Sequence, residues 1–192
     1  MAADRIDNRL SLLVLQHPQE KTEALATVPL LEANLANVRK AVGLSWPNLS
    51  RALGEPAEPR DWGVLHLGSA RPGSAPVTAV DAKGSPLADQ GVLRDLKGVI
   101  GLDGTWSQAK ALWWRNPWLL KCRRLVLNPP FASHYGRLRR EPRRESLSTL
   151  EAVGFALATL EGRPEILERL LAAFDALLRD SKPARPDRRR RR

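Results

Sequence analysis

The sequence is poor in cysteine, and its single thiol, Cys122, narrows the chemistry open to the chain. One cysteine forms no intrachain disulfide and builds no cysteine-based zinc site. The three histidines, His17, His66 and His134, show no spacing typical of a metal site either. We therefore expect a protein without a bound metal, located in a reducing cytoplasm.

Long apolar runs are also missing. No stretch approaches the length that spans a membrane, and the polar start over residues 1–9 is not typical of a signal peptide. The chain contains no Gly-x-x-x-x-Gly-Lys-Thr, no Gly-x-Gly-x-x-Gly and no Gly-x-Ser-x-Gly pattern. These absences count against a Walker-type phosphate loop, a dinucleotide-binding fold and an α/β-hydrolase.

Positive charge, by contrast, is abundant. Lys and Arg number 31 against 21 acidic residues, which gives a net charge of +10 over 192 residues. Clustered cations favour a polyanionic partner because they release counterions from phosphates. The arginines gather at 123–124, at 137–144 and at 188–192. Such clusters indicate a nucleic-acid interface or, for the last group equally, a solvated surface.

Apolar runs alternate with amphipathic stretches, which predicts a single α/β domain with a mostly parallel sheet flanked by helices. Strands are predicted at 10–15, 41–43, 62–67, 76–81, 99–102 and 125–127. Helices are predicted at 29–38, 46–53, 92–96, 105–113, 148–160 and 166–178. We expect this domain to cover residues 1–180 and a basic, disordered tail to cover residues 181–192.

The stretch 99–110 joins an apolar strand to a helix and carries the best candidate for a site. Asp103 and Gly104 make the turn, and Thr105 or Ser107 caps the helix that follows. An acidic side chain thus stands at the carboxyl end of a strand, where open α/β sheets bind ligands. Asp103 either caps the helix or faces a ligand. Trp106 and Trp113 share one helix face and either pack in the core or wall a ligand.

Three blocks of sequence together resemble one known family. Residues 102–106 read Leu-Asp-Gly-Thr-Trp, residues 16–20 read Gln-His-Pro-Gln-Glu, and Leu-Arg-Arg at 138–140 precedes Leu-Ser-Thr-Leu-Glu-Ala at 147–152. The chain in this respect resembles the DTW-domain family, the tRNA-uridine aminocarboxypropyltransferases, and the blocks occur in the family's order. Many bacterial members carry an N-terminal cysteine cluster that this chain lacks, which agrees with the expected absence of metal.

The resemblance implies a fold and a reaction. The family is related to SPOUT-type RNA methyltransferases, so it implies a SPOUT-like sheet with a C-terminal trefoil knot. It also implies transfer of the 3-amino-3-carboxypropyl group of S-adenosylmethionine to N3 of a tRNA uridine, with release of methylthioadenosine. The implied partner is tRNA, and the enzyme is expected as a monomer or a homodimer.

The resemblance also assigns candidate roles. Asp103 is the expected catalytic residue, which accepts the N3 proton or orients the reactants. Cofactor contacts are expected from Leu67, Gly68, Ser69, Leu102, Gly104, Thr105, Trp106, Leu147, Ser148 and Thr149. RNA contacts are expected from His17, Arg123, Arg124, Tyr135, Arg137, Arg139 and Arg140.

For several of these residues a purely structural role remains an alternative. His17 is as consistent with a structural turn as with a ligand contact, and Tyr135 either stacks on a base or anchors its loop. We expect Arg139 and Arg140 either to bind RNA phosphates or, for one of them, to form bidentate hydrogen bonds with the methionine carboxylate. Glu151 completes a capping box with Ser148. Two alternative functions remain: a SPOUT-like RNA methyltransferase, and a non-catalytic RNA-binding module.

Overall fold

A single six-stranded sheet forms the centre of the molecule. The computed structural model describes residues 5–22, 26–66, 73–134 and 147–181. The strand order is β2-β1-β5-β3-β6-β4, and β4 at one edge is antiparallel to β6 while the other neighbours are parallel. The strands are β1 (Ser11–Gln16), β2 (Val38–Val42), β3 (Trp62–Leu65), β4 (Val77–Val80), β5 (Gly98–Asp103) and β6 (Arg123–Leu127).

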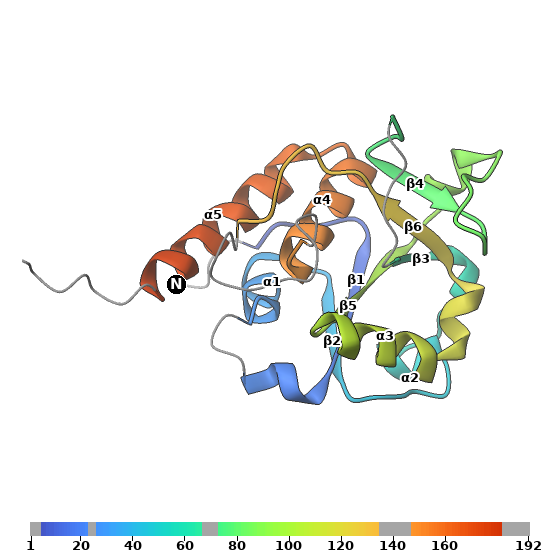
Figure 1. Cartoon of the computed structure of the whole chain (residues 1–192), viewed down its shortest axis with the longest axis horizontal. Helices are drawn as coiled ribbons and strands as arrows, with labels where there is room; N and C mark the ends of the chain where they lie inside the picture. Colours follow the sequence, from blue (N-terminus) through green and yellow to red (C-terminus); the bar gives the residue numbers. More distant parts are fainter. Residues whose placement is uncertain (1–4, 23–25, 67–72, 135–146, 182–192) are drawn as a thin grey trace, which may run out of the picture.

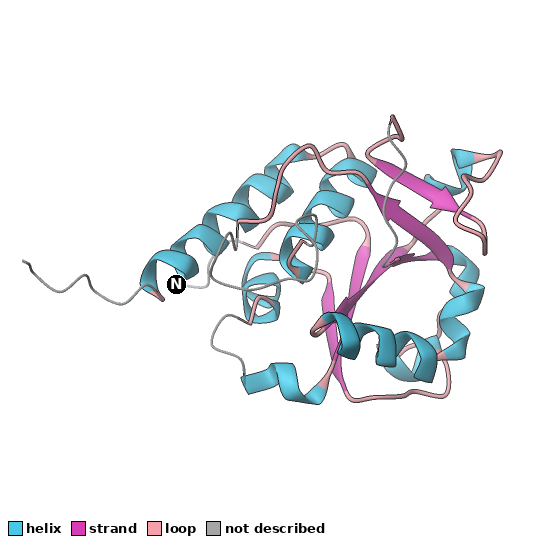
Figure 2. Ribbon diagram, in the orientation of Figure 1, coloured by secondary structure: helices cyan, strands magenta, loops and turns pink. Residues whose placement is uncertain are grey.

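Helices cover both faces of this sheet (Figure 1). One face carries α1 (Val28–Asn34), α4 (Thr149–Glu161) and α5 (Pro164–Asp180). The other carries α2 (Leu49–Leu53), α3 (Trp106–Arg115) and the 3-10 turn η4 (Pro117–Lys121). Three further 3-10 turns are η1 (Pro18–Thr22), η2 (Pro59–Asp61) and η3 (Gln90–Leu93). Figure 2 shows the strands enclosed between these two helical layers.

The alternation of side chains along each strand builds two separate hydrophobic cores. In β1, Leu12 and Val14 face the α1–α4–α5 layer, whereas Leu13 and Leu15 face the α2–α3 layer. All four side chains are fully buried. A strand that buries both faces reads as a continuous apolar run, which is why the sequence predicts these strands well. The predicted α/β class with a mostly parallel sheet is confirmed.

Side-chain caps place the two helices that begin at the site. Thr105 precedes α3 and forms a capping box with Gln108, and Ser148 precedes α4 and forms one with Glu151. Each box pairs backbone N–H groups that the first helical turn leaves without partners. The helix starts predicted at Thr105 and at residue 148 are therefore confirmed.

The second strand differs from the prediction. The apolar spacing extends the first helix to Val38, but α1 ends at Asn34 and Val38 opens β2, in register with Leu12. Asn8 holds this turn, because its side chain bonds both the N–H and the carbonyl of Asn37. A contact between residues 29 positions apart ends the helix, and helical spacing does not reveal it. The short helix predicted at 92–96 is the 3-10 turn η3, and the strand predicted at 62–67 ends at Leu65.

Two further properties concern the chain as a whole. None of the helices within the described ranges combines the length and apolar character needed to cross a membrane. The predicted trefoil knot depends on how the chain travels from β6 to α4. That path includes residues 135–146, which lie outside the described residues, and the knot stays a prediction.

Candidate active site at the carboxyl edge of the sheet

The strand order reverses between β1 and β5, which are neighbours at the middle of the sheet. The chain leaves β1 toward α1 on one face and continues to β2, on one side of β1. It leaves β5 toward α3 on the opposite face and continues to β6, on the other side of β5. In open α/β sheets the carboxyl ends of two such strands are the usual place for a ligand.

Asp103 is the last residue of β5 and lies at this point. Its side chain is buried, with 6% of the residue exposed, and Oδ2 accepts a hydrogen bond of 2.8 Å from Nε2 of Gln16. Gln16 ends β1, is directly opposite Asp103 in register and is 3% exposed. The carbonyl of Asp103 accepts a bond of 2.9 Å from the backbone N–H of His17. The register of the two parallel strands therefore holds the carboxylate in place.

The Asp103 carboxylate is not the cap of α3, because Thr105 and Gln108 provide that cap. Among the described residues, its second oxygen Oδ1 accepts no hydrogen bond. Of the two roles that the sequence leaves open, helix capping is wrong. One carboxylate oxygen is thus fixed by Gln16, and the other retains its capacity to accept a proton or a hydrogen bond.

Gly104 lets the end of β1 and the start of α3 approach closely. Its φ is +158°, and a Cβ there would lie 2.8 Å from Cβ of Gln108 and 3.4 Å from Cβ of His17. Gln108 accepts a bond of 2.7 Å from the N–H of Thr105 and donates one of 3.0 Å to Oε1 of Gln19. The first turn of α3 is thereby tied to η1, directly beside Asp103.

The start of α4 reaches β5 from the opposite face. A Cβ on Gly101, two residues before Asp103, would lie 3.1 Å from Cγ2 of Val153 and 3.7 Å from Cγ2 of Thr149. This small residue lets the first turn of α4 rest on the strand. The backbone N–H groups of Thr149 and Leu150 donate no hydrogen bond to any residue in the described ranges; Thr149 is half-buried and Leu150 is fully buried.

Glu151 does more than complete the capping box that the sequence predicts. The residue is fully buried, and Oε2 accepts bonds of 2.7 Å from Oγ of Ser133 and from the N–H of Ser148. Its Oε1 accepts a bond of 2.6 Å from the N–H of His134. One buried carboxylate thus joins the two ends that flank the arginine-rich residues 135–146. His134 in turn contacts Asp175 on α5 at 2.7 Å.

His66 is a residue of this edge that the sequence reasoning did not assign to the site. It directly follows β3, and its ring packs against Trp113 with the centroids 5.3 Å apart. Its buried Nδ1 has no hydrogen-bond partner. Burial and, secondly, the charge of Arg124 lower the pKa of His66 below its ordinary value of 6.5, so the ring is neutral at pH 7. Its place at the end of a buried strand is the signal that would have identified it.

The structure does not bring the first arginine pair to the carboxylate. Arg123 and Arg124 begin β6, and Arg124 is in register with Val64 and thereby with Ile100, three residues before Asp103. The Arg124 guanidinium lies 5.5 Å from the Trp113 ring and donates a bond of 3.0 Å to the carbonyl of Ala82. Arg124 is therefore engaged within the protein.

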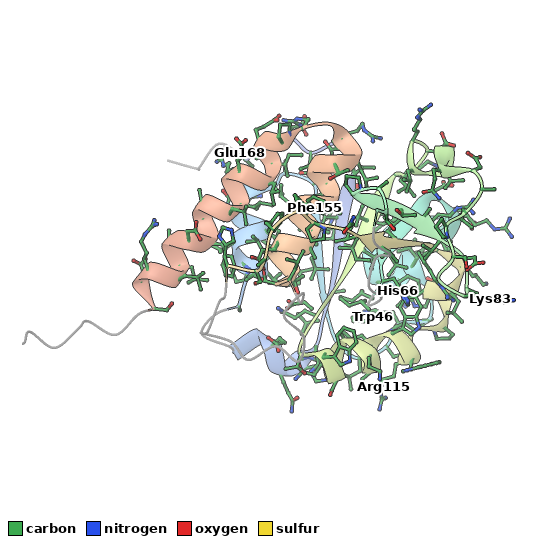
Figure 3. The ribbon with its side chains drawn as sticks, turned by 45° about the horizontal axis from the view of Figure 1, so that its top comes forward. Trp46, His66, Lys83, Arg115, Phe155 and Glu168 are labelled. Carbon is green, nitrogen blue, oxygen red and sulfur yellow. The ribbon has the colours of Figure 1, made fainter. Side chains whose placement is uncertain are left out.

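The remaining predicted contacts divide into three groups. Leu147 directly precedes Ser148, the N-cap of α4. His17, Gly104, Thr105 and Trp106 lie next to Asp103 in the chain or in register, and Leu102 is buried in the core beneath α3. Outside the described residues lie Leu67, Gly68, Ser69, Tyr135, Arg137, Arg139 and Arg140. Figure 3 shows His66 near the middle of the molecule and Arg115 on α3 at its lower edge. No group of His, Cys, Asp or Glu suited to a metal ion occurs in the part of the chain that the structure describes.

A mostly parallel sheet covered on both faces, with a buried carboxylate where the strand order reverses, is typical of α/β proteins that bind a ligand at the carboxyl edge of the sheet. The DTW domain matches residues 2–182, and this chain belongs to the DTW-domain family. The resemblance read from the three sequence blocks is thereby confirmed.

Curated relatives carry one shared name, tRNA-uridine aminocarboxypropyltransferase 2. The chain is 32% identical to the Drosophila melanogaster protein over 174 residues, which cover 86% of this chain and 62% of that protein. It is 32% identical to the Macaca fascicularis protein and 33% identical to the Mus musculus protein, each over 172 residues that cover 86% of this chain and 53% of the relative. The chain thus spans less than two thirds of the length of these relatives. No solved structure matches it.

Proposed function

We propose that this chain transfers the 3-amino-3-carboxypropyl group of S-adenosylmethionine to N3 of a uridine in tRNA. Membership of the DTW-domain family and the shared name of the relatives support this proposal. The observation that carries it is the Asp103 carboxylate, which Gln16 holds at the point where the strand order reverses.

The reaction forms one bond and breaks another. The sulfonium of adenosylmethionine supplies an activated leaving group, so the bond from its sulfur to the γ carbon breaks as N3 of the uridine bonds to that carbon. Methylthioadenosine leaves with the electron pair of the broken bond, and the proton of N3 must be removed. Asp103 accepts that proton through Oδ1, while Gln16 keeps Oδ2 in place. The rigid strand ends hold the reactants in line.

The residues at this edge fit the charges of adenosylmethionine. The Asp103 carboxylate complements a sulfonium cation, and the N–H group of the half-buried Thr149, which has no partner among the described residues, suits the methionine carboxylate. The Nδ1 atom of His66 is buried without a hydrogen-bond partner, which costs desolvation free energy. A hydrogen bond between this atom and a ligand would offset that cost. In this proposal Gly104, Thr105, Trp106 and Ser148 complete the cofactor contacts, together with Leu67, Gly68 and Ser69.

The finer features of the family belong to the same proposal. They are a SPOUT-like trefoil knot, a domain that ends near residue 180 before a basic tail, and RNA contacts from His17, Tyr135 and the arginines of 137–140. A cytoplasmic enzyme acting as a monomer or a homodimer completes it. Among these features, the mostly parallel sheet supports an α/β fold of this kind, and the end of α5 at Asp180 supports the domain boundary.

Product analysis tests the reaction directly. The purified protein is incubated with unmodified tRNA and with adenosylmethionine labelled in its aminocarboxypropyl group. We expect label on a tRNA uridine and an equal amount of methylthioadenosine. Release of S-adenosylhomocysteine would instead establish a methyltransferase, and RNA binding without either product would establish a non-catalytic module.

Asp103→Asn tests the role of the carboxylate, because the amide keeps the shape of the side chain but accepts no proton. We expect a fall in kcat of about 10²- to 10⁴-fold with little change in KM. Asp61→Asn is the matched control, since Asp61 is a carboxylate of η2, before β3, where it pairs with Lys97 at 2.6 Å. Equal activity of the two variants would refute a catalytic role for Asp103.

A further inference from the structure

The outer face of α3 carries a large aromatic side chain in contact with water. Trp114 is 75% exposed, more than Leu120 at 53% or Val42 at 42%, the next large hydrophobic side chains of the described surface. A tryptophan usually buries most of its area, and tryptophan is enriched at interfaces, where one end of the side chain is apolar and the other is in contact with water. The mechanism proposed for Asp103 does not use this residue.

Trp114 belongs to a row of exposed residues that begins at the candidate site. Ser107, Lys110 and Trp114 are exposed and are spaced by three and then four residues, so they share one face of α3. Trp106 opens the helix beside Asp103, and the helical rise places Trp114 about 12 Å further along the axis. The indole thus lies beyond the reach of the reacting base but within the span of a longer substrate.

The chain segment around this indole carries positive charge only. The sequence contains no Asp or Glu between Asp103 and Glu141. Lys110, Arg115 and Lys121 are all exposed, and none of them forms an ion pair with any described residue. Elsewhere on the surface Lys40 pairs with Glu32 and Lys97 pairs with Asp61. Figure 3 shows Arg115 on the outer side of α3.

We propose that the exposed surface of α3 and the following turn η4, which we call the α3 platform (Lys110, Trp114 and Arg115 of α3 and Lys121 of η4), binds an unpaired stretch of the RNA substrate next to the modified uridine. Trp114 stacks on one base, and the three cations contact the neighbouring phosphates. Exposed aromatics among cations are how proteins bind single-stranded nucleic acid. The proposal rests on the proposed function, because it gives the RNA a second contact outside the reaction site.

A second copy of the chain is a poorer occupant of the α3 platform. Two such faces would bring like charges together, and lysine is depleted in the centre of protein interfaces. A polyanion with exposed bases satisfies both the cations and the indole.

Binding of a fluorescent, unmodified tRNA transcript to the full chain tests the stacking contact. Trp114→Ala should raise Kd about tenfold, the effect of losing one base stack, whereas Trp114→Phe should remain within about threefold of the parent protein. Leu120→Ala is the matched control, because it removes an exposed apolar side chain from the neighbouring turn and should leave Kd unchanged. Equal Kd values for Trp114→Ala and Leu120→Ala would overturn the proposal.

The salt dependence of the same binding tests the cations. Lys110→Ala and Arg115→Ala should each reduce the slope of log K against log salt by about 0.7, the value for one phosphate of a single strand. Unchanged slopes would overturn the phosphate contacts. If sedimentation shows that Trp114→Ala converts a dimer to a monomer while RNA affinity stays the same, the platform is an interface between copies and the proposal fails.

Release of methylthioadenosine in the same samples separates this proposal from the one on which it rests. If the parent protein releases none with any tRNA, the proposed function fails, whatever Trp114 does. If the parent protein is active and Trp114→Ala has the same KM and the same Kd, transfer stands and the α3 platform fails. We expect a raised KM with kcat nearly unchanged.

Discussion

His66 combines a neutral ring with an unpaired nitrogen at the end of β3. Its pKa is lowered first by burial and then by the positive charge of Arg124. The lowered pKa means that the folded chain resists protonation more than the unfolded chain does. This residue therefore links the acidity of the medium to stability.

We expect acid to weaken the fold through His66. Above its ordinary pKa of 6.5 the ring is neutral in both states, so stability is unaffected. As the pH falls below that value the unfolded chain takes up the proton first, and the free energy of unfolding falls. His66→Phe keeps a ring against Trp113 and should lose less stability between pH 7.5 and 5.5 in urea titrations. An equal loss in the parent protein and the variant would contradict this assignment.

At the scale of elements, the start of α4 depends on Glu151 as much as on its own N-cap. Three donors from Ser133, His134 and Ser148 converge on this fully buried carboxylate. The arrangement positions the first turn of α4 against Gly101 of β5 and so contributes to the candidate site without touching a reactant.

Removal of this carboxylate should therefore cost more than removal of an ordinary cap. Glu151→Ala removes the acceptor that three donors share, and we expect the free energy of unfolding to fall by about 3 kcal/mol. Ser148→Ala, which removes only the capping hydroxyl, should cost about 1 kcal/mol. Urea titrations of both variants measure the two values. If Glu151→Ala were no more destabilising than Ser148→Ala, the start of α4 would not depend on the Glu151 carboxylate.

At the scale of the whole molecule, the net charge of +10 predicts binding to RNA that weakens steeply with salt. The arginines at 188–192 lie outside the described residues and are tested by truncation after Lys182. We expect the truncated chain to bind tRNA more weakly and with a smaller salt slope, because each lost phosphate contact lowers the slope by about 0.7 to 0.9. An unchanged slope would show that the tail contacts no phosphate.

Several elements are predictable because their signals are local. The apolar runs around Val14 and Ile100, the capping boxes at Thr105 and Ser148, and the spacing of α5 each need only a few neighbouring residues. The boundary between α1 and β2 was misplaced because its cause, the bond from Asn8 to Asn37, comes from a distant part of the chain.

Some residues of the candidate site are likewise indicated by local sequence signals, and others are not. Asp103 and Ser148 are visible in the sequence, because each stands where a strand or a loop meets a helix. Gln16 is not visible as the partner of Asp103, since the register of two strands 87 residues apart decides it. The bonds from Glu151 to Ser133 and His134 were missed for the same reason, whereas His66 carried a local signal, its place at the end of a buried strand. Pairs of this kind form only when the sheet closes.

The sequence by itself determined the α/β class, most of the strands and helices, the caps and the acidic residue at the end of β5. These follow from hydrogen bonds and apolar periodicity within single segments. Only the tertiary structure decided the strand order, and with it the meeting of Gln16 with Asp103, the burial of Glu151 between two distant ends and the exposure of Trp114. The physical reason is that burial and strand register depend on contacts between segments, and no segment specifies its neighbour alone.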